Sequence, residues 1–232
     1  MKKISFIGCY DKIDIILYIA KILVELDKKV LIIDTTVNQK AKYIVPVIKP
    51  TKAYVTEFEK IDVAVGFKNF DELKEYLGLT KFSEIPYDFI LLDIDSYESI
   101  INFNINEEEK KYFVTGSDLY TLKKGLEILS GIKEIMHLTK VIFSQNINKE
   151  DNDYLNYLSL GYKIVWNEEV IYFPFEYGDA SVIAENQRVA KIKFKKLSNQ
   201  YKEGLIFIAE QILGQSENWK VKKVFKQLER GF

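Results

Sequence analysis

The chain has 232 residues, of which 47% are hydrophobic, enough to bury the core of one α/β domain. Its 33 basic and 34 acidic residues give a net charge of −1, which excludes a protein that binds nucleic acid through its overall charge. One cysteine and one histidine exclude an internal disulfide and a metal site built from these residue types. The sequence predicts neither a signal peptide nor a membrane span, so we expect a cytoplasmic protein.

The first predicted unit is a strand, a glycine turn, a helix and a second strand. Residues 4–7 are rich in β-forming side chains, and the turn begins at Gly8. An apolar helix follows, and the apolar strand 30–33 ends on Asp34. This order of elements is typical of a phosphate-binding P-loop.

The turn itself differs from a working P-loop. Such a loop needs glycines where its backbone approaches the phosphates, a lysine for the phosphates, and a Ser or Thr hydroxyl for Mg²⁺. Between Phe6 and Asp14 there is one glycine and one lysine, Lys12. Asp11 before this lysine adds a negative charge, and Ile13 after it offers no oxygen to a metal. A second interpretation is an ordinary turn, in which Asp11 or Asp14 caps the helix or favours its dipole.

Strand and helix patterns continue to alternate along the chain. The strand 87–93 is almost continuously apolar, as expected for a strand buried on both faces, and it ends on Asp93. The remaining predicted strands are 61–65, 112–115, 140–143, 162–166 and 170–173. The remaining predicted helices begin near 69 and 118, the latter running to about Met136 beside His137, and lie within 149–160, 179–190 and 197–213. Repeated β-α-β units predict an α/β fold with a mostly parallel, doubly wound sheet and helices on both faces.

Three segments carry a resemblance to a known family. They are Lys28–Thr36 (KKVLIIDTT), Tyr87–Ser96 (YDFILLDIDS) and Phe113–Leu129 (FVTGSDLYTLKKGLEIL). They resemble the MinD/ParA family of deviant-Walker P-loop ATPases, including its pilus-assembly relatives of the TadZ/CpaE type. The resemblance spans most of residues 2–213 and implies a P-loop NTPase-like fold.

The resemblance also implies roles for individual residues. Asp34 falls where the family places an aspartate near Mg²⁺ and the attacking water, and Asp93 falls at the Walker B position. Lys12 falls at the phosphate-binding lysine, so that Gly8, Lys12, Asp34 and Asp93 would form a vestigial nucleotide site. Three other positions depart from the family pattern. The lysine that reaches across a dimer is Ile7, the glycine before the phosphate lysine is Asp11, and the Mg²⁺-binding threonine is Ile13.

The C-terminal segment has a different character. We divide the chain into residues 1–213, the P-loop-like domain, and 214–232, a linker and a basic amphipathic helix with Asn218 as its predicted N-cap. Apolar residues follow helical spacing, and five basic residues stand on the remaining surface against one acidic residue, Glu229. The candidate membrane or partner residues are Trp219, Val221, Lys222, Lys223, Val224, Phe225, Lys226, Leu228, Arg230 and Phe232. The alternatives are packing on the domain, docking on an anionic membrane or an acidic partner, and binding nucleic acid. The MinD branch has a similar C-terminal helix.

These observations predict a pseudo-ATPase. We expect a non-hydrolysing scaffold, localisation or assembly factor for a pilus, secretion, conjugation or positioning machine. It would have no cofactor and would bind protein partners, and any homodimer would form without nucleotide clamping. We expect it in the cytoplasm, with peripheral attachment to the inner face of the membrane as an open alternative. Two other functions stay open: an atypical active ATPase that uses ATP and Mg²⁺, and a partition protein that binds DNA nonspecifically. The near-neutral net charge argues against nucleic acid as the partner.

Overall fold

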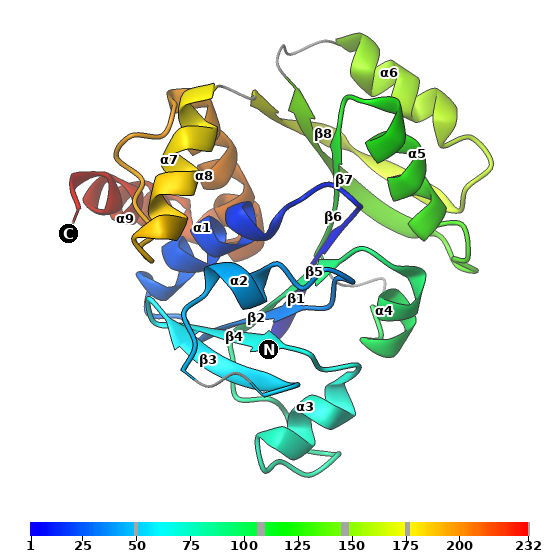
Figure 1. Cartoon of the computed structure of the whole chain (residues 1–232). Helices are drawn as coiled ribbons and strands as arrows, with labels where there is room; N and C mark the ends of the chain where they lie inside the picture. Colours follow the sequence, from blue (N-terminus) through cyan, green and yellow to red (C-terminus); the bar gives the residue numbers. More distant parts are fainter. Residues whose placement is uncertain (49–50, 106–109, 145–148, 175–176, 232) are drawn as a thin grey trace.

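Eight strands form one sheet in the order β3-β4-β2-β5-β1-β6-β7-β8 (Figure 1). The computed structural model describes residues 1–48, 51–105, 110–144, 149–174 and 177–231. The strands are β1 Lys2–Ile7, β2 Val30–Asp34, β3 Tyr54–Phe58, β4 Ile61–Val65, β5 Phe89–Ile94, β6 Lys110–Gly116, β7 Met136–Ser144 and β8 Ile164–Pro174. β3 pairs antiparallel with β4, and all other neighbouring strands are parallel. The predicted mostly parallel sheet is confirmed.

Helices cover both faces of the sheet, as the sequence predicts for a doubly wound fold. In chain order they are α1 Ile13–Val24, α2 Ala41–Ile44, α3 Phe70–Tyr76, α4 Tyr97–Asn102, α5 Leu119–Ile128, α6 Lys149–Leu158, α7 Tyr177–Arg188, α8 Asn199–Leu213 and α9 Asn218–Arg230, with a short 3₁₀ helix, η1 Gln215–Glu217, before α9. One core contains buried side chains of α1, α8 and α9. The core on the other face contains side chains of α3, α4, α5 and α6.

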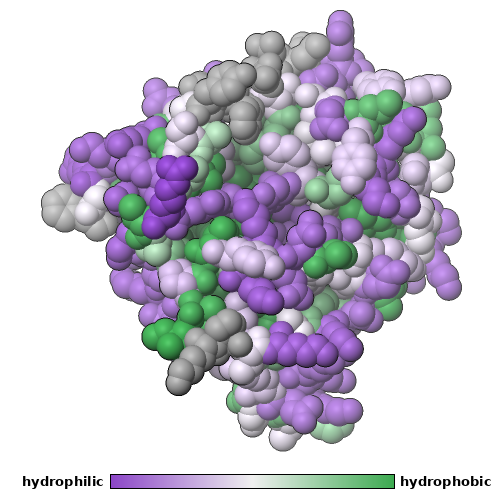
Figure 2. All heavy atoms as spheres, in the orientation of Figure 1, coloured by the Kyte–Doolittle hydropathy of each residue, from purple (hydrophilic) through white to green (hydrophobic). Residues whose placement is uncertain are grey.

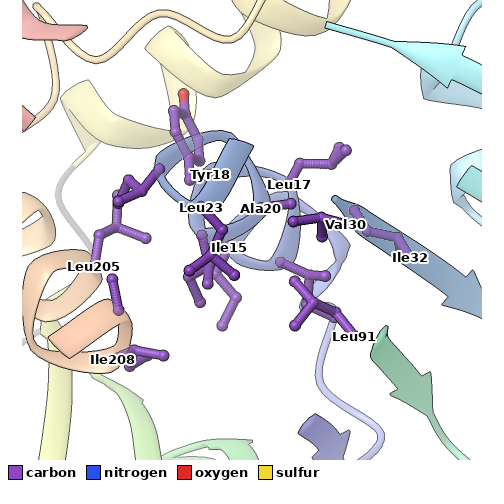
Figure 3. Close-up of a cluster of buried hydrophobic side chains, with 14 of the residues drawn as sticks. Ile15, Leu17, Tyr18, Ala20, Leu23, Val30, Ile32, Leu91, Leu205 and Ile208 are labelled. Atoms are coloured by element: carbon purple, nitrogen blue, oxygen red, sulfur yellow. The ribbon is translucent and has the colours of Figure 1, made fainter. Parts of the chain in front are cut away.

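The first of these cores is built around α1. Every residue of this helix except Asp14 is buried, and all the buried ones except Lys21 are hydrophobic, as expected for a helix enclosed by neighbours. Figure 3 shows Ile15 and Leu23 of α1 among side chains from β2, β5 and α8. The enclosed helix fixes the position of the turn that precedes it, and with it the candidate site.

Some predicted boundaries are wrong. α5 ends at Ile128, well before Met136, and His137 lies on β7 with its side chain exposed. The apolar pattern continues past the helix, but the chain turns near Gly131, where a Cβ would lie 2.6 Å from the ring of Tyr97. Only a residue without a side chain fits against that ring.

Two further predictions need correction on the β8 side and at the C-terminus. The two strands predicted at 162–166 and 170–173 are one strand, β8, whose register against β7 shifts between Leu138 and Lys140. The shift leaves residues 167–169 of β8 as a bulge, which interrupts the apolar pattern without ending the strand. The residue before α9 is Glu217, and it makes no side-chain cap, so Asn218 is the first helical residue and not the N-cap.

Strand β3 is not predicted by the sequence pattern. It joins β4 through Glu59 and Lys60, which both have positive φ values, 54° and 70°. This geometry is typical of a two-residue hairpin turn. Glycine and asparagine are the usual residues there, so a Glu-Lys pair gives no turn signal.

Candidate nucleotide site

The candidate site lies at the carboxyl ends of β1, β2 and β5. Asp34 and Asp93 are paired in register on the neighbouring strands β2 and β5, and the turn after β1 lies beside them. The structure has a pocket of 410 Å³ here. Its lining residues are Cys9, Tyr10, Asp11, Lys12, Thr36, Asn38, Lys40, Tyr43, Asp93 and Asp95. In Figure 2 hydrophilic residues predominate over the middle of this view, where Figure 1 places α2 and the start of α1. This edge is where open α/β sheets bind their ligands.

Gly8 is required by the backbone. Its φ is +147°, and a Cβ would lie 2.0 Å from the carbonyl oxygen of Val114 on β6. Its N–H donates to the carbonyl oxygen of Ile94 at 3.0 Å. The glycine therefore allows the turn to pass closely over β6, which is a packing requirement and needs no phosphate.

Lys12 points into the protein. Its side chain is buried, and its Nζ donates to the carbonyl oxygen of Gly8 at 2.8 Å. The same Nζ lies 2.7 Å from Oδ1 of Asp93. The ammonium that a P-loop directs at phosphates is thus bound by two groups of the protein itself.

Asp93 is 3% exposed and carries the charge that balances Lys12. Burial raises the pKa of its carboxyl to about 6, the Lys12 ammonium lowers the pKa, and the Asp34 carboxylate raises it. An aspartate of this kind is ionised at pH 7 at a substantial cost in folding free energy. Removing Lys12 would increase that cost.

Asp34 holds the segment that follows β2. Its Oδ1 accepts hydrogen bonds from the N–H of Thr36 at 3.0 Å and from the Thr36 hydroxyl at 2.6 Å. Its Oδ2 accepts from the N–H of Ala41, the first residue of α2, at 2.9 Å. Both carboxylate oxygens are therefore bound within the chain, as in a turn and helix-start motif.

Lys40, which the sequence pattern does not single out, neutralises the acidic turn. Its Nζ lies 2.5 Å from Oδ2 of Asp11 and 2.9 Å from Oδ2 of Asp14. Burial lowers the pKa of Lys40, but the carboxylates of Asp14 and Asp11 outweigh this effect, so the pKa is raised. Gln187 of α7 donates to Oδ1 of Asp14 at 2.7 Å. No local pattern marks Lys40, because it lies in the loop after β2 and meets the turn only in the folded chain.

The two isoleucines are core residues. Ile7 and Ile13 are fully buried, in the two different cores on opposite faces of the sheet. Neither position therefore reaches the pocket or the surface. The residue at the N-cap position of α1 is Lys12, and no side chain caps this helix, so the prediction that Asp11 or Asp14 caps it by a hydrogen bond is wrong. Asp14 does stand in the first turn, where its charge favours the helix dipole.

The described residues offer no dedicated metal site. Within them, no group of three or more His, Cys, Asp or Glu side chains is placed to hold a metal ion. Asp95, which also lines the pocket, accepts hydrogen bonds from the N–H of Val37 at 3.1 Å on each of its oxygens. The carboxylates at this edge of the sheet are thus placed by contacts within the chain.

The C-terminal helix is packed on the domain. Four apolar residues of α9 are buried in the same core as α1 and α8: Val221, Val224, Phe225 and Leu228. The ring of Phe225 meets that of Phe194 edge-on, with centroids 5.3 Å apart. The structure thus shows packing on the domain, the first of the three alternatives for this segment.

The other side of α9 faces outward. The side chains that remain exposed are Trp219, Lys222, Lys223, Lys226 and Arg230, and Phe232 lies outside the described residues. In the part of the chain that the structure covers, no helix is long and apolar enough to span a bilayer.

Comparisons with known proteins identify the fold. Neither the models of known protein families nor the curated proteins give a match. Solved structures of P-loop ATPases do match over nearly the whole chain. The MinC:MinD cell division complex of Aquifex aeolicus matches at 13% identity, with a TM-score of 0.58, covering 93% of this chain and 96% of that one. A ParA family ATPase from Chlorobium tepidum matches at 12% identity, with a TM-score of 0.57 and coverage of 90% and 97%.

A third match was solved with a nucleotide analogue. It is a plasmid partition protein of Borrelia burgdorferi bound to AMPPNP, at 14% identity, with a TM-score of 0.54 and coverage of 97% and 98%. The class defined by the sheet order and by these matches is an α/β fold of the P-loop NTPase type. More particularly, the chain has the fold of the MinD/ParA ATPases, as its sequence predicts.

Proposed function

We propose that this protein is a non-hydrolysing pseudo-ATPase of the MinD/ParA fold, with a degenerate Walker A loop, that acts as a scaffold, localisation or assembly factor. The observation that carries the proposal is the ammonium of Lys12, which is buried and bonded to Gly8 and Asp93. A lysine held in this way supplies a structural cation. It does not supply a free phosphate ligand.

Three requirements of phosphoryl transfer are affected together. The phosphate lysine is paired with Asp93, the carboxylate of Asp34 holds Thr36 and Ala41, and the hydroxyl position is the buried Ile13. Losing one preorganised donor alone lowers an enzyme's rate by about 10²–10³-fold. A phosphate would also have to draw Lys12 away from Asp93, which would leave a buried carboxylate without its partner. These changes together support the absence of hydrolysis.

Protein partners are part of the proposal. A MinD of this fold has been solved with MinC, so the fold is used in at least one protein–protein complex. We propose that this chain likewise works within a larger assembly, such as a pilus, secretion, conjugation or positioning machine of the kind that TadZ/CpaE-type relatives serve. Ile7 is fully buried, so a homodimer would need contacts other than a lysine at this position.

A second candidate function is nucleotide binding without hydrolysis. The pocket of 410 Å³ favours it, since space remains beside the turn, and the Borrelia protein of this fold was solved with AMPPNP. A bound polyphosphate would meet the carboxylates of Asp11 and Asp93 at this pocket and would compete with them for Lys40 and Lys12. Because of this competition, we favour a protein that binds no nucleotide.

Attachment to a membrane would have to use the exposed side of α9. The apolar side of the helix is buried. An anionic membrane would therefore meet mainly the exposed side chains of Lys223, Lys226 and Arg230, with Trp219. Each basic residue near such a surface contributes about 1 kcal/mol. Sedimentation with anionic vesicles at low and high salt tests this, and equal pelleting with neutral vesicles would dispose of it.

Phosphate release tests the main proposal. Purified protein is incubated with Mg²⁺ and ATP, beside an Asp34→Ala variant and beside buffer. We expect release by the wild-type protein to equal release by the variant. Sustained release above the Asp34→Ala level would overturn the pseudo-ATPase assignment. Comparing the two proteins, purified in the same way, removes the contribution of contaminating ATPases.

A further inference from the structure

Helix α6 is held to the sheet by polar as well as apolar contacts, since Leu155 is fully buried in the core. On the side that faces the sheet, Asn152 and Asn156 accept hydrogen bonds from the Nζ of Lys140 at 2.6 and 2.5 Å. Lys140 is buried on β7, and its Nζ lies 5.1 Å from the centre of the Trp166 ring. Polar groups thus occupy part of the inward side, where a surface helix usually carries apolar residues alone.

The outer side of α6 is partly apolar. Tyr157 is 68% exposed and Leu160, just after the helix, is 73% exposed, with Tyr154 also exposed. Glu150 and Asp153 are exposed nearer the start of the helix. We call these five residues the acidic stripe, because they follow at spacings of three or four along one side and carry two carboxylates. Large exposed side chains gathered on one helix are typical of a contact surface.

Helix α9 presents a complementary set. Trp219, Lys223, Lys226 and Arg230 stand at i, i+4, i+7 and i+11, and all are exposed, Trp219 by 64%. We call these four residues the basic stripe. Its three cations form no ion pair with any residue that the structure describes. Cations without partners at the surface are available to an acidic contact.

The two stripes match in length and in order. At about 1.5 Å per residue, each stripe is about 15 to 17 Å long. The acidic stripe begins with its carboxylates and ends with Tyr157 and Leu160. The basic stripe begins with Trp219 and ends with its cations. An antiparallel arrangement of the two helices therefore brings Trp219 to the apolar end of the acidic stripe and Arg230 to Glu150.

One chain cannot make this contact with itself. Figure 1 shows α6 and α9 at opposite sides of the molecule. We propose that copies of this chain associate head to tail, with the basic stripe of one copy on the acidic stripe of the next. Such a contact is heterologous, so each added copy presents a fresh stripe and the assembly grows beyond a dimer. The proposal goes beyond the scaffold function and does not depend on whether a nucleotide binds.

The contact is small. Two helix surfaces of this length belong to the class of interfaces below about 1,200 Å², which associate weakly and reversibly. Charge contributes much of the complementarity, so association should weaken at high salt, where the screening length falls to about 3 Å at 1 M. The mass in solution should therefore depend on both protein and salt concentration.

Sedimentation velocity with paired variants tests the proposal. One variant alters the acidic stripe, Tyr157→Ser with Leu160→Ser, and another alters the basic stripe, Lys223→Glu with Lys226→Glu. Matched controls change comparable exposed residues elsewhere, a tyrosine with a second large apolar residue and a pair of lysines: Tyr76→Ser with Phe82→Ser, and Lys68→Glu with Lys81→Glu. All positions are exposed, and thermal unfolding confirms that each variant folds.

We expect the wild-type protein and both controls to grow in mass with concentration at low salt and to return to the 27.1 kDa monomer at high salt. Each stripe variant alone should stay a monomer. An equimolar mixture of the two should form a dimer and nothing larger, because each partner supplies one intact stripe. A wild-type protein that stays monomeric at low salt overturns the proposal, as does self-association that the stripe variants leave unchanged. A basic stripe that binds duplex DNA in a monomeric protein would equally overturn it.

Discussion

The buried pair of Lys12 and Asp93 makes a prediction with a distinct pH signature. Lys12→Met keeps an unbranched side chain and removes the ammonium, which leaves Asp93 buried without its counterion. With Lys12 present, the pKa of Asp93 is about 6 against an ordinary value of 3.8. That difference disfavours folding at pH 7 by about 3 kcal/mol. Without Lys12 the pKa rises further, until Asp93 is protonated in the folded state at pH 7.

Protonation of Asp93 limits how much stability Lys12→Met loses. At pH 7, protonating a carboxyl of ordinary pKa costs about 4 kcal/mol, so the Asp93 part of the change is about 1–2 kcal/mol. The lost hydrogen bond from Lys12 to the carbonyl of Gly8 adds about 1 kcal/mol. We therefore expect Lys12→Met to lower the free energy of unfolding by about 2–3 kcal/mol at pH 7. At pH 5 the folded wild-type protein already protonates Asp93, so the loss should shrink to about 1 kcal/mol.

Urea unfolding followed by circular dichroism at both pH values measures these quantities. The double variant Lys12→Met/Asp93→Asn serves as the control, since it has no charge to titrate at this pair. Relative to it, the wild-type protein should lose stability as the pH rises from about 4 to about 6, where the folded state holds the proton of Asp93 and the unfolded state has released it, and the difference should level off above that range. A Lys12→Met variant as stable as the wild type at both pH values would refute the reasoning, because the ammonium would then be free to serve a ligand.

Three other predictions concern single positions, each measured by urea unfolding. Gly8→Ala places a Cβ 2.0 Å from the oxygen of Val114 and should lower the free energy of unfolding by about 3 kcal/mol or more, as a disrupted core contact does. The control is Gly178→Ala, where a Cβ meets nothing within 4 Å, and its stability should be within about 1 kcal/mol of the wild type. Equal effects at both glycines would contradict the close approach of Gly8 to Val114. Phe225→Ala removes a buried ring that joins α9 to the core and should cost about 3–5 kcal/mol, whereas a neutral result would mean that α9 is not docked. Burial lowers the pKa of Lys140 to about 8, so the folded protein releases this proton at a lower pH than the unfolded chain. Between pH 7.5 and 9.5 the free energy of unfolding of the wild-type protein should therefore rise by about 1–2 kcal/mol relative to that of Lys140→Met. A fall over that range would contradict the lowered pKa.

The fold could be predicted from the sequence because its signals are local and repeated. The apolar strands that end on Asp34 and Asp93 lie between helix patterns, and this alternation allows few topologies other than a parallel doubly wound sheet. The errors fall where a local pattern is ambiguous. The apolar spacing of α5 continues past its end, and the β3–β4 hairpin turns through Glu59 and Lys60, which carry no turn signal.

The site was predicted only in part, because its decisive contacts join distant segments. Gly8, Lys12, Asp34 and Asp93 could be chosen from their places at strand ends. The partner of each side chain could not be predicted, because partners lie far apart in the chain: Lys12 is 81 residues from Asp93. Lys40 was missed for the same reason. Spacing along a helix showed that α9 is amphipathic, but burial of its apolar side depends on the shape of α1 and α8, which no sequence pattern reports.

Isothermal titration of the wild-type protein with Mg·ATP, repeated with ADP and GTP, tests whether the paired Lys12 can still bind a phosphate. We expect no saturable heat up to millimolar nucleotide, because the two lysines of the pocket, Lys12 and Lys40, are already paired with Asp93 and Asp11. Micromolar affinity that disappears in a folded Lys12→Ala variant would contradict this expectation.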